Sequence, residues 1–227
     1  MIASVHVADL GLAAGLRVLR AAPKPSAVPG LRHAEVGTAA PLSAKLLGAA
    51  QPGRVALLAF WDDDDAVDHF EATHPLAERL AGGWHSRLAP LRLHGAWPGV
   101  PDDLPTDRAV DAEGPAVVMT LGRLRLTQAP RFLRTSAKAE GAAIDAPGFL
   151  WGTGLARPPF MATCSVWASS AALATYAYGR REPAHADAIH ADEGKAFHKR
   201  SAFIRFRPYA TGGSLGDRNP FAGLPED

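Results

Sequence analysis

Short apolar runs alternate with segments of helical periodicity along the first half of the chain. The expected strands are residues 2–10, 30–39, 54–61 and 88–97, and the expected helices are residues 11–24 and 66–73. In the first helix Leu12, Leu16 and Leu19 recur at helical spacing, whereas residues 55–61 are continuously apolar, as in a buried strand. The resulting order is strand, helix, strand, strand, helix, strand, which is that of a ferredoxin-like unit.

The second half of the chain repeats this order. Residues 116–124 read as a strand and 128–138 as a helix, in which Leu133 and Lys138 correspond to Leu19 and Lys24, both 114 residues earlier (133 − 19 and 138 − 24). Two further strands follow at residues 151–154 and 161–167, then a helix after Trp167, and a closing strand at residues 201–208. The pattern therefore predicts an internal duplication, although short apolar strands also align by chance between unrelated α/β segments.

The duplication predicts both the domain organisation and the fold class. We expect a first ferredoxin-like half over residues 1–98, a proline-rich linker over 99–114, and a second half over 115–227 that carries the C-terminal tail. Each half alone leaves one sheet face uncovered, and this face must be buried. We therefore expect an α+β protein with two tandem ferredoxin-like repeats packed sheet to sheet as an intramolecular dimeric α+β barrel, with room inside for a flat apolar ligand.

Composition and charge narrow the classes of function. The 227 residues are 47% hydrophobic and 21% charged, which is typical of a folded protein. A formal charge of +1 offers no electrostatic footprint for nucleic acid. The single cysteine, Cys164, excludes an intramolecular disulfide and favours a reducing compartment. No stretch is long and apolar enough for an integral membrane segment. We expect a cytoplasmic protein with a small-molecule substrate.

One histidine has a distinctive setting. Ala188 and Ile189 lie three and four residues after His185, and the same helical stripe continues through Asp192 to Ala196. A lone imidazole on a mostly apolar helix face is typical of an axial haem ligand, because the iron binds a neutral nitrogen beside a large apolar disc. The same pattern also fits a core histidine bonded to a carbonyl. The sequence contains no P-loop, no GxGxxG and no HExxH motif.

Several short motifs keep a recognisable order through the second half. A strand ends in Ser165-Val166-Trp167, a helix contains Tyr176-Ala177-Tyr178, His185 follows, and the last strand contains Arg205-Phe206-Arg207-Pro208. In this order the chain resembles the spheroidene monooxygenase family. The resemblance implies haem b as an iron cofactor and an oxygen-dependent monooxygenase reaction with an electron donor. It also implies an apolar substrate, which is a carotenoid in the named members. It makes His185 the expected axial iron ligand.

The resemblance also suggests further site residues. Arg205 is a candidate catalytic residue: if its face looks into the barrel, its guanidinium would pair with a haem propionate or polarise an oxygen ligand, although exposed strand arginines are common. Trp151, Trp167, Tyr178 and Ile189 are candidates for the haem pocket, with plain core packing as the alternative. The family often has a tryptophan and an acid before the last strand, where this chain has residues 197–200, so its substrate need not be a carotenoid.

Two other functions fit the same pattern. A haem enzyme of another class, such as a dehydratase or a peroxidase-like protein, would use the same pocket. A cofactor-free barrel that binds or rearranges a small molecule would use His185 or another polar residue as a base. A homo-oligomer is compatible with each of these alternatives.

Overall fold

The computed structural model describes residues 1–227 except 21, 46–50, 108–112, 179–195, 217–218 and 222–227. The strands are β1 (Ile2–Asp9), β2 (Leu31–Pro41), β3 (Arg54–Trp61), β4 (Trp84–Gly95), β5 (Ala116–Leu124), β6 (Phe149–Arg157), β7 (Phe160–Trp167) and β8 (His198–Gly212). The helices are α1 (Leu12–Leu19), α2 (Asp64–Thr73), α3 (Pro75–Leu80), α4 (Ala129–Ile144), which follows a short 3₁₀ turn (Leu126–Gln128), and α5 (Ser170–Tyr178).

The eight strands form one closed antiparallel barrel made of two equivalent halves. The first half has the strand order β4-β1-β3-β2 and the second β8-β5-β7-β6, which is the same ferredoxin-like arrangement. The halves hydrogen-bond to each other at both edges, through β2 with β6, where Ala39 lies opposite Leu155, and through β4 with β8, where Leu93 lies opposite Ile204. The predicted α+β barrel is therefore confirmed, with edge pairing that joins the two sheets.

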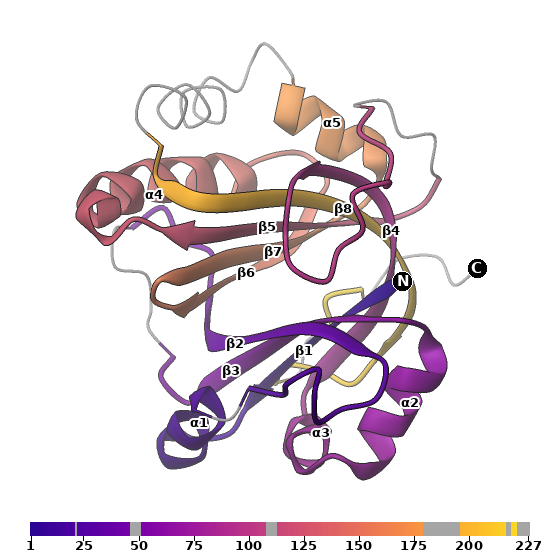
Figure 1. Cartoon of the computed structure of the whole chain (residues 1–227). Coiled ribbons are helices and arrows are strands. Elements are labelled where there is room, and N and C mark those ends of the chain that lie inside the picture. Colours follow the sequence, from indigo (N-terminus) through magenta and orange to yellow (C-terminus); the bar gives the residue numbers. More distant parts are fainter. Residues whose placement is uncertain (21, 46–50, 108–112, 179–195, 217–218, 222–227) are drawn as a thin grey trace.

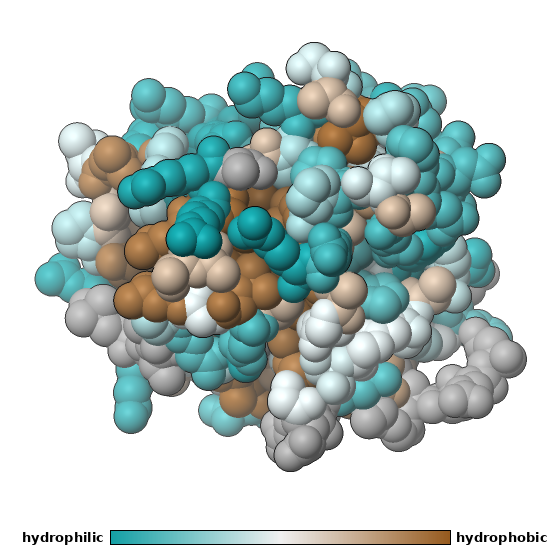
Figure 2. Space-filling view, turned by 90° about the horizontal axis from the view of Figure 1, so that it is seen from below, coloured by the Kyte–Doolittle hydropathy of each residue, from teal (hydrophilic) through white to brown (hydrophobic). Residues whose placement is uncertain are grey.

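Helices cover the outside of the barrel on two opposite sides. Figure 1 shows α1, α2 and α3 below the first sheet and α4 and α5 above the second. The view from below, in Figure 2, shows hydrophobic side chains gathered on one part of a largely hydrophilic face. Leu12 and Leu16 of α1 are 56% and 47% exposed, so this helix keeps part of its apolar surface in contact with solvent. None of the helices in the described residues is long and apolar enough to cross a bilayer.

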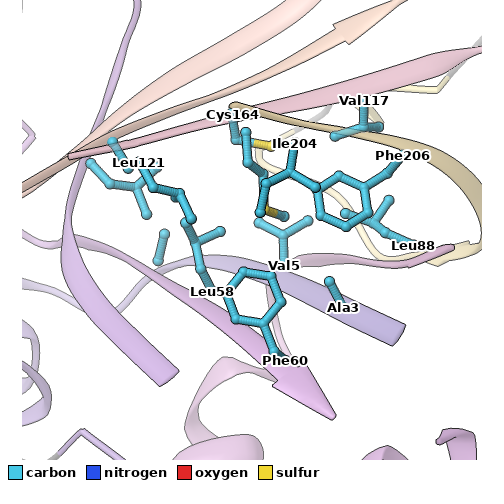
Figure 3. Packing of buried hydrophobic residues seen from close by; sticks show 14 of the residues in the cluster. Ala3, Val5, Leu58, Phe60, Leu88, Val117, Leu121, Cys164, Ile204 and Phe206 are labelled. Carbon is cyan, nitrogen blue, oxygen red and sulfur yellow. The ribbon is translucent and has the colours of Figure 1, made fainter. Parts of the chain in front are cut away.

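The barrel interior is filled by side chains that alternate along the strands. Because successive strand residues point to opposite faces, Val5 of β1, Leu58 of β3 and Ile204 of β8 all point inward. Figure 3 shows these residues converging with Phe60 and Phe206 in the middle of the barrel. The interior core contains 24 buried residues, none more than 9% exposed. It is a packed core.

Different elements close the two ends of the barrel. At one end, Trp97 and Val100 lie in the segment between β4 and β5 and belong to the interior core, at 3% and 7% exposed. At the other end, Trp84 packs on Trp151 and on Phe221 of the C-terminal tail, with ring centroids 5.1 Å and 5.9 Å apart. Part of the expected linker is thus packed against the barrel.

The outer layers of the two halves differ in density. Among the described residues, sixteen buried apolar residues lie between the first sheet and α1–α3, but only six lie between the second sheet and α4 and α5. On the second sheet Val118 is only partly buried, and Phe203 is 37% exposed. The outer face of the second sheet is therefore the more open one.

The helix boundaries differ from the sequence expectation in three places. Helix α1 ends at Leu19, short of residue 24, whereas α4 continues to Ile144. Helix α3 was not expected. It begins at Pro75 because the proline suits the first helical turn and because the His74 side chain accepts a hydrogen bond from Leu76 N. The helical segment expected around His185 lies outside the described residues.

Candidate functional site

A buried carboxylate lies inside the barrel near the end covered by Trp97. Glu35 of β2 is 2% exposed, because its neighbours Ala34 and Val36 point outward into the helix layer. Its Oε1 lies 2.9 Å from His33 Nε2 and also accepts a short hydrogen bond from Arg123 of β5. Arg157 Nη2 of β6 donates to Oε2 at 3.1 Å. Both halves thus contribute to one ionic cluster.

Aromatic rings surround this cluster. The Arg123 guanidinium carbon lies 5.5 Å from the ring centres of both Trp97 and Phe160, a distance typical of cation–π contacts. The His33 ring meets Trp97 edge-on at 6.5 Å. Two buried donors, Trp97 Nε1 and Arg157 Nε, have no hydrogen-bond partner among the described residues. Donors therefore outnumber acceptors at this end of the barrel.

A second candidate site lies on the outer face of the second sheet. Ala202, Ile204 and Phe206 point into the barrel, so Arg205 between them points outward, toward α5. It is 5% exposed, and among the described residues no acidic group forms an ion pair with it. Burial lowers the pKa of Arg205 from its ordinary value, and Arg92 acts in the same direction while Tyr178 opposes it. Arg205 is thus a buried cation for which the described residues supply no anionic partner.

His198 lies on the same outer face, at the start of β8. Its ring packs over Gly122 of β5, where an added Cβ would lie 2.4 Å from the imidazole Cδ2, so only glycine fits beneath it. Phe132 of α4 meets the ring edge-on at 5.2 Å, and Phe197 lies 5.8 Å from Phe132. The residues that depart from the family pattern therefore include an imidazole and one aromatic ring, both packed against Phe132 of α4.

The structure brings only some of the predicted site residues together. Tyr178, at the end of α5 and 43% exposed, is close enough to Arg205 to affect its charge. Trp167 lies on the same face but is 1% exposed and stacks on Tyr176 at 4.9 Å. Trp151 lies on the opposite, inner face beside Trp84. The catalytic role suggested for Arg205 required its side chain to point into the barrel. The side chain points outward instead. His185 and Ile189 lie outside the described residues.

The single cysteine is an inert core residue. Cys164 of β7 is fully buried in the barrel interior, and burial raises the pKa of its thiol to about 12. A neutral thiol in apolar surroundings is neither a nucleophile nor a metal ligand at neutral pH. Across the described residues, no group of three or more histidine, cysteine or acidic side chains is arranged to hold a metal ion.

A buried histidine in the first half has a structural role. His6 is 4% exposed beneath α2, and its Nε2 lies 3.2 Å from Ser4 Oγ, which also accepts a hydrogen bond from Trp61 Nε1 at 2.9 Å. Burial lowers the pKa of His6 to about 3, and the positive charges of His85 and Arg87 add to this effect. The imidazole is therefore neutral at neutral pH and serves as a hydrogen-bonding group within the core.

This histidine predicts a pH dependence of stability. Its folded-state pKa of about 3 lies below the ordinary value of 6.5, so between these values the unfolded chain binds more protons and stability falls as the pH decreases. Lowering the pH from 7 to 5 should cost about 2 kcal/mol, at about 1.4 kcal/mol per pKa unit. Urea unfolding of the native protein and of His6→Asn at both pH values measures this. An equal pH dependence in the two proteins would contradict the assignment.

Comparison with known proteins finds similarity to solved structures alone. No protein-family model and no curated protein matches the chain. A candidate monooxygenase from Fusobacterium nucleatum is 8% identical with a TM-score of 0.41, over 94% of this chain and 95% of that one. A candidate monooxygenase from Lactobacillus acidophilus is 10% identical with a TM-score of 0.39, over 94% and 97%. A haem-degrading enzyme from Listeria monocytogenes is 11% identical with a TM-score of 0.30, over 90% and 99%.

Proposed function

We propose that this protein is a haem-dependent oxidoreductase of the monooxygenase type, and that haem b binds on the outer face of the second sheet. The observation that carries the proposal is Arg205, a guanidinium that is 5% exposed and has no acidic partner among the described residues. A buried cation is costly unless an anion neutralises it. A haem propionate is an anion of suitable geometry for a guanidinium.

The packing of the molecule favours this outer face over the barrel interior as the haem site. The barrel interior is occupied by 24 buried residues. The outer face of the second sheet has a sparse helix layer, and partly covered apolar residues such as Val118 and Phe203 lie beside Arg205. A flat apolar disc with two carboxylates matches this combination of apolar surface and buried positive charge.

Residues of this chain would hold the group in defined ways. Arg205 would pair with a propionate, and Tyr178, next to it on α5, would orient that pair through its hydroxyl group. His185, seven residues after the end of α5 in sequence, would be the axial ligand. When bound, haem supplies oxygen activation, while the protein sets the polarity and access of the pocket. The sequence resemblance supports an apolar substrate of the carotenoid class.

The proposal is tested by spectroscopy and by one pair of variants. Purified protein supplied with haem should show a Soret band. Arg205→Gln should weaken haem affinity about tenfold to a hundredfold, the range measured when partners around a metal group are lost. Arg207→Gln is the matched control, because Arg207 lies on the same face of β8 but is exposed. A protein that stays colourless with excess haem, or equal haem affinity in the two variants, would contradict the proposal.

A cofactor-free function is the second candidate, and the Glu35 cluster favours it. A carboxylate and an imidazole 2.9 Å apart within a barrel are groups that move protons. In that case the purified protein is colourless, and Glu35→Gln abolishes turnover while Arg205→Gln leaves it intact. Haem titration followed by optical spectroscopy separates the two functions.

A further inference from the structure

A groove opens at the surface beside the Glu35 cluster, at the end of β5 and the start of β8. It encloses a volume of about 660 Å³. Four of its lining side chains are cationic: Arg123, Arg125, Lys199 and Arg200. Leu124, Leu126 and Pro159 contribute apolar surface to the same wall, and Leu126 is 62% exposed. No acidic residue is among the described residues that line it. The groove therefore combines concentrated positive charge with an apolar strip.

The described residues neutralise little of the positive charge of this groove. Among the described residues Glu35 is the one acidic partner of Arg123, and it also serves Arg157 and His33. Within the described part of the chain, Arg125, Lys199 and Arg200 form no ion pair with an acidic residue. Arg125 instead donates from Nε to the carbonyl oxygen of His198 at 3.3 Å. Several like charges held in one concave surface raise the local potential and attract anions.

The buried side of the groove also contains hydrogen-bond donors that have no partner among the described residues. Trp97 Nε1 lies within the cluster, is completely buried and has no partner among the described residues, as is also true of Arg157 Nε. A buried polar group without a partner is destabilising, unless a ligand or an ordered water completes it. Arg123 connects the two parts, because it lines the groove and also lies over the Trp97 ring.

From this arrangement we propose that the groove is a binding site for an amphipathic small molecule with an oxyanion head, either a carboxylate or a phosphate. Arg123, Arg125, Lys199 and Arg200 bind the head, and the wall of Leu124, Leu126 and Pro159 contacts the apolar tail. The groove lies at the mouth of the barrel and is independent of haem, so it remains even if the proposed function is wrong.

Isothermal titration calorimetry with three ten-carbon probes tests this site on the purified full chain without added haem. Decanoate and decyl phosphate carry the two candidate heads, and decanol carries none. Both anions should bind, and decanol at least about tenfold more weakly, because a hydrogen bond to a charged group contributes about 1.5–3 kcal/mol. Raising the NaCl concentration from about 50 to 500 mM should weaken the anions, since salt screens exposed charges. The tighter of the two anions identifies the head.

A pair of variants on one strand locates the binding. Lys199 and Arg200 are both exposed, so Lys199→Gln/Arg200→Gln should leave the fold intact and weaken decanoate at least about tenfold. Arg207→Gln removes an exposed arginine of β8 outside the groove and should change the affinity less than about twofold. Equal binding of decanol and decanoate, or an unchanged affinity in the double variant, would overturn the proposal. A protein that binds no haem when haem is added, yet still binds decanoate, would leave this inference standing while the proposed function fails.

Discussion

His185→Ala is expected to abolish haem binding, whereas His190→Ala and His198→Ala retain it. The reason is a sequence pattern: Ala188 and Ile189 follow His185 at helical spacing, which predicts an apolar helix face around the imidazole. Haem whose iron has lost its axial histidine nitrogen loses most of the binding affinity that this bond supplies. Haem content per chain, measured on the three purified variants after incubation with excess haem, checks the prediction.

The structure makes His198 the most informative of the controls. It lies on the open face of the second sheet, over Gly122 and against Phe132, so it is close to the proposed haem position. Haem loss in His198→Ala with full retention in His185→Ala would move the axial ligand to the start of β8. Full retention in all three variants would remove the proposed mode of ligation altogether.

Either half of the chain expressed alone is expected to form aggregates or homodimers and no stable monomer. In the whole protein β2 and β4 of the first half hydrogen-bond to β6 and β8 of the second. A separate half exposes both edges and the whole apolar inner face, and surfaces of this kind associate. Size-exclusion chromatography with light scattering on residues 1–107 and 113–227 measures the outcome.

Co-expression of the two fragments provides the control. Together they should recover a one-to-one complex of the size of the intact chain, because the edges and inner faces of one complement those of the other. A soluble, folded monomer of either fragment would show that the interior contacts between the halves are not required, in contradiction to the packing described above.

The strand pattern could be predicted because each strand carries its own signal. Residues 55–61 are apolar throughout because β3 lies in the middle of the first half-sheet, covered by the barrel core on one side and by helices on the other. Strand β5 was predicted with both ends correct, bounded by Pro115 and by the polar residues after Leu124. The duplication followed from the repeated order of such local signals.

The Glu35 cluster could not be predicted, because its members are distant in sequence. Arg123 lies 88 residues and Arg157 122 residues from Glu35, and they meet only because the two halves close into one barrel. The available local signal was a charged residue at an inward position of an apolar strand, between Ala34 and Val36. Such a residue signals a buried partner without indicating which one.

The alternation of side chains along β8 could not by itself predict the direction in which Arg205 points. Alternation separates Phe203, Arg205 and Arg207 from Ile204 and Phe206, but it does not say which set faces inward. The apolar set fills the barrel, as burial requires, and the arginines take the helix side. Arg205 is nevertheless buried there, at 5% exposed, which a strand pattern does not indicate.

The unequal outer layers of the two halves affect how many ligand molecules one barrel is expected to bind. A barrel built from two identical chains repeats every side chain about its symmetry axis, so its binding sites occur in equivalent pairs. Among the described residues, sixteen buried apolar residues lie beneath the helices of the first half and six beneath those of the second. Fusion into one polypeptide removes the requirement for equivalence, so that the first half can specialise as scaffold. We therefore expect one ligand molecule to bind per barrel, without cooperativity between two equivalent sites.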